Sequence, residues 1–190
     1  MTMSGPDGHA RASSITDPPS LEEIINHVKG ASPLTSPGPD GLGYALYASI
    51  PPLCQLLHTL YTEIWTTASY PTSWTHTYIK PLPKPGKDHT RKENYRPIAL
   101  LNVDYKIFTG IIANRLKQHS QNIFPIHQMG FIAGRSTHMA ALAFSSIILS
   151  SPTPAMVALL DFEKAYDRVS HDWLTTILYP SNFPPSSTHS

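Results

Sequence analysis

The chain has 190 residues, 41% of them apolar, which is enough to bury the core of one moderate domain or one lobe of a larger enzyme. Charged residues make up only 14%, against about 25% in ordinary soluble domains, and 19 prolines predict irregular connections. The single cysteine, Cys54, excludes an internal disulfide, and with His58 it supplies only two of the ligands that a zinc site needs. With neither a signal segment nor an apolar stretch of about 18 residues, we expect an intracellular protein without a membrane span.

The first third of the chain predicts two helices separated by a proline-rich loop. Ser20 and Glu23 have the spacing of a capping box, at the start of a helix that should end near Lys29. A second helix is expected from Pro52 to Ala68. Its apolar stripe and two nearby indoles should form a core, and these residues are Leu53, Leu56, Leu57, Leu60, Ile64, Trp65 and Trp74.

A β-hairpin with a basic tip is expected next. Residues 77–82 and 96–101 have the pattern of two short strands, joined by a polar loop over 84–94. The prolines at 81, 83 and 85 should end the first strand, because proline donates no hydrogen bond to a ladder. Nine of the 14 Lys and Arg residues lie between Lys80 and Lys117, where they either attract phosphate or form a solvated basic face.

The second half of the chain predicts further helices and one buried strand. A helix is expected over residues 104–117, and a mostly apolar, mostly buried helix over 137–149. Residues 156–160 are apolar on both faces, as in the central strand of a sheet. A last helix should begin near Ser170. The inward face of the first of these helices consists of Ile107, Phe108, Ile111, Ile112 and Leu116.

The sharpest chemical signal is the carboxylate of Asp161, which directly follows the expected buried strand. A carboxylate in that position is costly unless it pairs with a cation or a metal. Polymerases use such a carboxylate to hold the divalent ions that lower the barrier to in-line phosphoryl transfer. An acidic cap on the following helix is an equally good interpretation of this segment alone.

Other sequence blocks place this segment in context. In chain order they are Pro37–Gly41, Pro81–Asp88, Glu93–Asn102, Lys106–Ile107 with Ala113–Leu116, and His127–Thr137. In order and spacing, these blocks and the Asp161 segment resemble the reverse transcriptases of non-LTR retrotransposons, the long interspersed elements, in particular those of vertebrate type. The resemblance covers roughly residues 34–173.

The resemblance implies an RNA-directed DNA polymerase that uses an RNA template, a DNA primer, deoxynucleotide triphosphates and two Mg²⁺ ions, in a family found in cytoplasm and nucleus. The fold should be α/β, a partial right-hand polymerase of mixed helices and short strands. Residues 1–19 would be a disordered segment, 20–76 a helical N-terminal extension, 77–179 the fingers and first part of the palm, and 180–190 an irregular tail.

The same resemblance assigns roles to nucleotide-site residues. Arg96 would clamp the triphosphate, and Lys84 is a second candidate for that role. Asp161 resembles the first metal-binding aspartate of the palm, with the Phe162 carbonyl as a second ligand. Tyr166 resembles the aromatic gate whose ring collides with a ribose 2′-hydroxyl.

The template and primer would contact four further residues, namely Lys87, Gln128, Gly130 and Arg135. Arg135 could equally well cap the helix before it, and the glycines of this segment could supply only backbone freedom. Asp167 is interpreted as a local cap rather than a metal ligand.

One part of the family's pattern is missing from the sequence. No pair of adjacent aspartates occurs, so the second catalytic motif is absent, and so is the Gln-Gly helix motif. We therefore expect a truncated fragment that is inactive as a polymerase by itself. The alternatives are a non-catalytic nucleic-acid-binding fragment and a non-functional retroelement relic.

Overall fold

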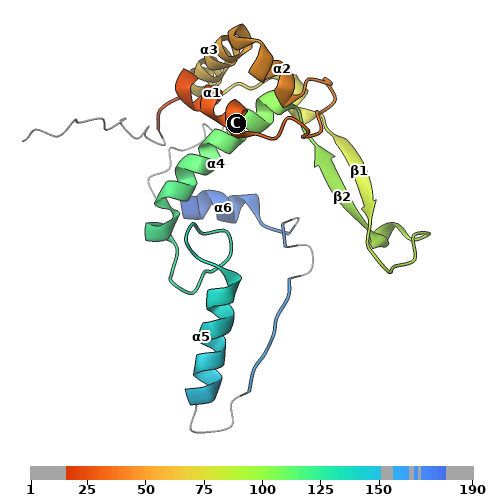
Figure 1. Cartoon of the computed structure of the whole chain (residues 1–190), viewed down its shortest axis with the longest axis vertical. Coiled ribbons are helices and arrows are strands. Elements are labelled where there is room, and N and C mark those ends of the chain that lie inside the picture. The colour runs from red at the N-terminus through yellow and green to blue at the C-terminus, as the bar shows by residue number, and fades with distance from the viewer. Residues whose placement is uncertain (1–15, 151–155, 163–164, 167, 179–190) are drawn as a thin grey trace, which may run out of the picture. The chain divides into compact units, whose positions relative to one another are not determined.

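The computed structural model describes residues 16–150, 156–162, 165–166 and 168–178. Among them are helices and one two-stranded sheet, which confirms the expected mixture of helices and short strands (Figure 1). No helix in this part of the chain is long and apolar enough to cross a membrane. Of the segment expected to be disordered, residues 1–15 lie outside the described residues. Pro19, at its end, is fully buried.

The chain folds as two compact units, Met1–Asn114 and Arg115–Ser190. The division falls inside a helix, whereas the sequence predicted subdomain boundaries after residues 19, 76 and 179. Those boundaries concern the parts of a polymerase and stay predictions. The expected tail over 180–190 lies outside the described residues.

The first unit is built on four helices, which are α1 Leu21–Gly30, α2 Tyr44–Ser49, α3 Pro51–Thr67 and the first part of α4 Val103–Ile123. The capping box is confirmed, since Ser20 Oγ accepts from Glu23 N at 3.2 Å and Glu23 Oε2 accepts from Ser20 N at 2.9 Å. Such a cap stabilises a helix by about 1 kcal/mol. Helix α2 was not predicted, because its six residues carry too short a pattern to recognise.

The core of this unit lies where these four helices meet, with Ile24, Tyr61 and Ile107 completely buried. Trp65 and Trp74 close it as expected, because each indole packs against the ring of Phe108, with centroids 6.2 and 5.3 Å apart. The predicted inward position of Leu56 is wrong, since its side chain is 65% exposed. The buried stripe of α3 instead runs along Cys54, Leu57, Tyr61 and Ile64.

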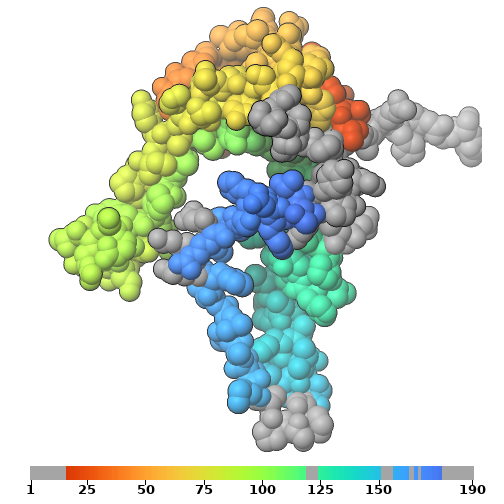
Figure 2. Space-filling view, turned by 180° about the vertical axis from the view of Figure 1, so that it is seen from behind, coloured from red at the N-terminus to blue at the C-terminus, as the bar shows by residue number. Residues whose placement is uncertain are grey.

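Strands β1 Tyr78–Pro83 and β2 Tyr95–Leu100 form the predicted antiparallel hairpin. Two short 3₁₀ helices, η1 Thr72–Thr75 and η2 Lys92–Asn94, precede β1 and β2 respectively. Figures 1 and 2 show the hairpin extending away from the helices of its unit.

The prediction that the prolines end β1 fails for Pro81, which lies inside the strand and pairs with Pro97, whereas the strand does end at Pro83. Residues of an antiparallel pair alternate between positions that exchange hydrogen bonds and positions that face outward. Lys84 N donates to Asn94 O at 2.8 Å, so even-numbered positions of β1 face the partner strand. The odd-numbered prolines of β1 therefore occupy outward positions, where no ladder donor is needed.

The second unit contains helix α5 Thr137–Ser150 and helix α6 His171–Leu178. Helix α5 was predicted to be buried, and this is wrong, since none of its residues is buried. Residues 156–160 were predicted to form a central strand, and this is also wrong: they form no strand, and Leu159 and Leu160 are about 90% exposed. The physical reason is a missing partner, because the only strands among the described residues are β1 and β2, which pair with each other.

Candidate functional site

The hairpin presents a basic face. Side chains at directly opposed positions, and at every second residue along each strand, share one face of a sheet. The register places Leu82 opposite Arg96 and Lys80 opposite Ile98. Lys80 and Arg96 therefore lie diagonally on the same face, and both side chains are exposed. This face of the hairpin therefore carries two exposed cations.

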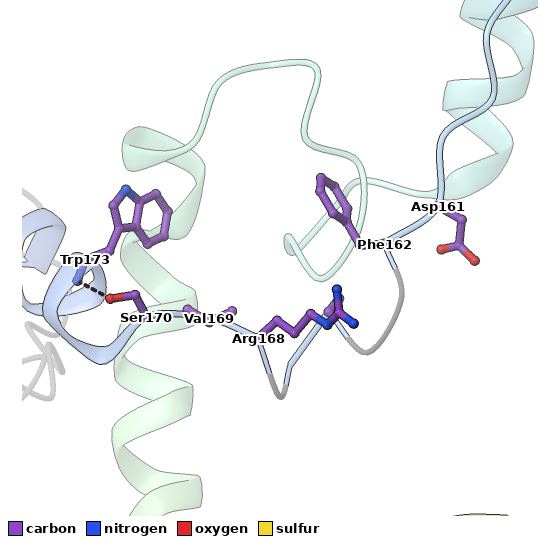
Figure 3. Close-up of a pocket in the computed structure, with 7 residues that line it drawn as sticks. Asp161, Phe162, Arg168, Val169, Ser170 and Trp173 are labelled. Carbon is purple, nitrogen blue, oxygen red and sulfur yellow. Dashed lines mark hydrogen bonds between the residues drawn. The ribbon is translucent and has the colours of Figure 1, made fainter. Parts of the chain in front are cut away.

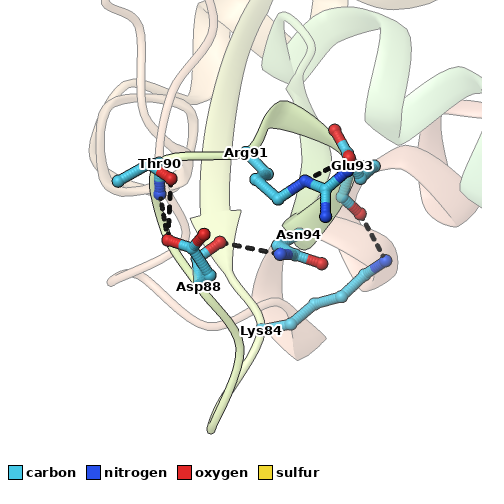
Figure 4. A network of polar contacts seen from close by, with 6 residues as sticks. All are labelled: Lys84, Asp88, Thr90, Arg91, Glu93 and Asn94. Carbon is cyan, nitrogen blue, oxygen red and sulfur yellow. Dashed lines mark hydrogen bonds and ion pairs between the residues drawn. The ribbon is translucent and has the colours of Figure 1, made fainter.

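The tip of the hairpin is held by its own hydrogen bonds (Figure 4). Lys84 Nζ donates to the Glu93 carbonyl at 2.8 Å, and Asn94 Nδ2 donates to the Asp88 carbonyl at 2.7 Å. Asp88 Oδ1 accepts from Thr90 N at 3.0 Å and from Thr90 Oγ1 at 2.8 Å, and these bonds lower the pKa of Asp88. The Lys84 ammonium has three donors, so a fixed position still leaves two for a ligand.

A tight turn brings two lysines together at this tip. Lys87 N donates to the Lys84 carbonyl at 3.3 Å, and Gly86 between them has φ 70°. That left-handed conformation suits glycine, because a side chain there would strain the backbone. Lys87, like Arg96, is exposed. The structure thus gathers three of the sequence-predicted residues, Lys84, Lys87 and Arg96, on a single hairpin.

Arg135 occupies a different environment, in the loop after α4. Its guanidinium donates to the carbonyls of Phe124 at 3.1 Å and Gln128 at 2.9 Å, and also to the carbonyl of Pro125. Gln128 Nε2 donates to the Gly130 carbonyl at 3.1 Å. Arg135 therefore satisfies carbonyls just beyond the end of a helix, which favours the capping interpretation. A contact of Gln128, Gly130 or Arg135 with a template stays a prediction.

Asp161 lies on an open hollow of about 690 Å³ in the second unit (Figure 3). The residues that line it are Asp161, Phe162, Ala165, Arg168, Val169, Ser170 and Trp173. Its volume falls within the range of small-molecule sites, about 300–1,000 Å³. The Trp173 ring and the Arg168 guanidinium, which sequence reasoning missed, join Asp161 there. The side chain of Tyr166 is 83% exposed, and its gate role stays a prediction.

The metal site expected at Asp161 is incomplete among the described residues. No three side chains of His, Cys, Asp or Glu in this part of the chain come close enough to hold an ion. Glu163 and Asp167 lie outside the described residues. Asp161 and the Phe162 carbonyl could supply at most two ligands to one ion, whereas two-metal catalysis needs carboxylates that clamp two ions.

The base of the hairpin is fixed by residues that had no predicted role. Asn102 Oδ1 accepts from Asp40 N at 3.3 Å, and Lys106 Nζ donates to the Ser36 carbonyl at 2.8 Å. Burial lowers the pKa of Lys106, and the nearby Asp40 carboxylate opposes that shift. Asn102 directly precedes α4, and an Asn in that place is a recognised helix-capping signal, so its importance could have been predicted from the sequence.

The described residues thus form a basic hairpin in one unit and, in the other, a pocket of about 690 Å³ that the Asp161 carboxylate helps to line. A family model described as reverse transcriptase (RNA-dependent DNA polymerase) matches residues 82–189, more than half of the chain. The chain therefore belongs to the reverse transcriptase family.

Curated relatives support the same family, and their names refer to mobile elements. A probable RNA-directed DNA polymerase from transposon BS of Drosophila melanogaster is 33% identical over 81% of this chain and 18% of its own length. The transposon TX1 uncharacterized 149 kDa protein of Xenopus laevis is 29% identical over 92% of this chain and 14% of its own length. The RNA-directed DNA polymerase from mobile element jockey of Drosophila melanogaster is 28% identical over 87% of this chain and 19% of its own length.

These names confirm the resemblance to non-LTR retrotransposon reverse transcriptases. The chain spans less than a fifth of the length of each of these three relatives.

Proposed function

We propose that this chain carries the phosphate-binding hairpin and the first catalytic carboxylate of an RNA-directed DNA polymerase. The substrates would be an RNA template, a DNA primer and deoxynucleotide triphosphates. The observation that carries the proposal is the shared face of Lys80 and Arg96, with Lys84 and Lys87 at the tip above it. Four cations on one exposed hairpin form a surface that phosphate groups recognise.

The chemistry of Arg96 suits the triphosphate of an incoming nucleotide. A guanidinium is planar and always charged, and it donates two parallel hydrogen bonds to paired phosphate oxygens. Lys84 acts as a point charge whose stem is fixed by its bond to the Glu93 carbonyl. Lys87, Gln128, Gly130 and Arg135 would contact the template or primer in the same proposal.

Enzymes of this family generally use a divalent metal, here taken as Mg²⁺. Asp161 and the Phe162 carbonyl would hold one ion, which would stabilise charge on the phosphate under attack. The hollow beside Asp161 would receive the nucleotide, with Arg168 as a further cation on its wall. Tyr166 would exclude ribonucleotides from it.

Binding of the 190-residue chain to a labelled DNA primer on an RNA template tests the hairpin directly. The affinity is measured by fluorescence anisotropy at several salt concentrations, for wild type, Lys80→Ala, Lys87→Ala and Lys29→Ala, because Lys80 and Lys87 are exposed hairpin cations that the proposal does not assign to the triphosphate. Removing one cation that binds a phosphate should reduce the slope of log K against log salt by about 0.7–0.9. Lys29 is an exposed lysine on α1, so it matches the charge change away from the hairpin.

We expect a smaller slope for Lys80→Ala and Lys87→Ala, and an unchanged slope for Lys29→Ala. Equal slopes for all four proteins would refute the hairpin as the phosphate-binding surface. An equal decrease in all three variants would refute it as well, since the effect would then depend on net charge alone.

A further inference from the structure

Both ends of the hairpin are attached to the first turn of α4. After β2 ends at Leu100, only Leu101 and Asn102 separate the strand from the helix. Before β1 begins, the chain passes through η1, which contains Trp74. The hairpin itself buries little, since all of β1 and most of β2 are exposed, and an isolated two-stranded hairpin is only marginally stable. Its direction must therefore be set at its two attachment points.

The attachment after β2 depends on Asn102, whose side chain is 4% exposed. Its Oδ1 accepts from Asp40 N across 62 residues of sequence. Gly38 is pressed against the same residue: a Cβ on Gly38 would lie 2.3 Å from Asn102 Oδ1 and 2.5 Å from the carbonyl carbon of Leu101. Only glycine fits there, because real Cβ atoms do not approach so closely.

The attachment before β1 depends on Asp104. Its Oδ2 accepts from Trp74 Nε1 at 2.9 Å, and its carbonyl accepts from the Tyr61 hydroxyl at 2.6 Å. Burial, and then the Asp104 carboxylate, raise the pKa of Tyr61, so the phenol stays protonated and remains a donor. The indole of Trp74 also packs against Tyr105, with ring centroids 5.1 Å apart. Trp74 is thereby held to α4 by both a hydrogen bond and ring packing.

We propose that Asn102 and Asp104 are positioning residues, which fix the direction of the basic hairpin so that its cations engage one nucleic-acid strand together. Asn102 acts through the loop around Gly38, and Asp104 acts through Trp74. The proposal rests on phosphate binding by the hairpin, the function proposed above. Cations on a hairpin that swings freely would contact phosphates one at a time, whereas a fixed hairpin aligns several at once.

Two substitutions loosen these attachments without removing a charge. Gly38→Ala forces Asn102 and the loop apart, and Gly43→Ala is its matched control, because a Cβ on Gly43 meets nothing within 4 Å. Trp74→Phe keeps an aromatic ring but removes the N–H that Asp104 accepts. The full 190-residue chain is used throughout, with the same RNA–DNA primer–template. Circular dichroism verifies folding, and titration at high concentration gives the binding stoichiometry.

We expect Gly38→Ala and Trp74→Phe each to reduce the salt slope by about 1 or more, as if a cation had been removed, at unchanged stoichiometry. Gly43→Ala should behave as wild type. A lower stoichiometry with an unchanged slope would overturn the proposal, because it would mean only that less protein is folded. If Gly38→Ala does not fold, the salt slope of Trp74→Phe alone tests the positioning role.

The outcomes separate this inference from the proposed function. If Lys80→Ala and Lys87→Ala reduce the slope but Gly38→Ala and Trp74→Phe do not, the hairpin binds phosphate and the positioning role is wrong. If none of the four changes the slope, the phosphate-binding function itself is wrong.

Discussion

The imidazole of His27 on α1 lies directly over Gly110 on α4, so closely that a Cβ on Gly110 would be 2.3 Å from Cε1 and 2.9 Å from Nε2. We predict that Gly110→Ala destabilises the fold. Overpacking costs about 1–3 kcal/mol and exceeds the roughly 1 kcal/mol that alanine gains over glycine in a helix. Urea unfolding should show a loss of about 1 kcal/mol, whereas Gly30→Ala, which meets open space, should show none. Equal stability of the two variants would contradict the contact.

Burial of His27 beneath this packing lowers its pKa below the ordinary 6.5. The unfolded chain therefore binds a proton more readily than the folded chain, and stability should fall as the pH drops below about 6.5. The loss is complete once the pH is below the folded pKa. Urea unfolding at about pH 7.5 and 5.5 measures this loss. From the higher to the lower pH, the free energy of unfolding should fall less for His27→Gln than for wild type. An identical pH dependence would show that His27 titrates normally.

Arg96→Ala should weaken nucleotide use in a full-length polymerase that carries this segment. A hydrogen bond to a charged group contributes about 1.5–3 kcal/mol, so kcat/KM for deoxynucleotides should fall by roughly 10- to 150-fold. Steady-state primer extension over a range of nucleotide concentrations measures this. Unchanged KM and kcat would remove Arg96 from the nucleotide site.

Tyr166→Ala should admit ribonucleotides in the same full-length enzyme, because the ring would no longer collide with the 2′-hydroxyl. The measurement is the ratio of kcat/KM for a deoxynucleotide to that for the matching ribonucleotide. Tyr166→Phe keeps the ring and should keep the discrimination. If the ratio is the same in Tyr166→Ala and wild type, the gate assignment is wrong.

Purified residues 1–190 should not extend a primer on an RNA template with Mg²⁺ or Mn²⁺. Two-metal catalysis needs carboxylates from two separate segments to hold the ions about 3.5–4 Å apart, and the sequence lacks the adjacent aspartates of the second segment. Asp161→Ala is the matched control. Extension above the level of that control would disprove the expectation.

Local patterns predicted the elements of this fold well. The capping box at Ser20, helix α3 and the hairpin all depend on residues close in sequence, and each is present. Burial was predicted less well, because it depends on partners that a local pattern does not contain. Helix α5 and residues 156–160 are apolar enough for a core, yet the described residues supply nothing that covers them.

The candidate site shows the same division. Lys84, Lys87 and Arg96 could be grouped from the sequence, since one hairpin carries them all. The capping position of Asn102 can be recognised in the sequence, but the contacts that Asn102 and Asp104 make could not be predicted, because their partners lie 62 and 30 residues away, at Asp40 and Trp74. Contacts of that kind follow from the fold and cannot be predicted from spacing.

The prolines of the hairpin also govern how the chain meets copies of itself. Along the outer edge of β1 the outward positions are Ile79, Pro81 and Pro83, and only Ile79 carries an N–H. A strand from a neighbouring molecule would find one donor where a continuous ladder needs three. An exposed hairpin normally favours intermolecular strand addition and fibril growth. The outer edge of β1 is therefore a poor template for further β-pairing, although the strand is exposed.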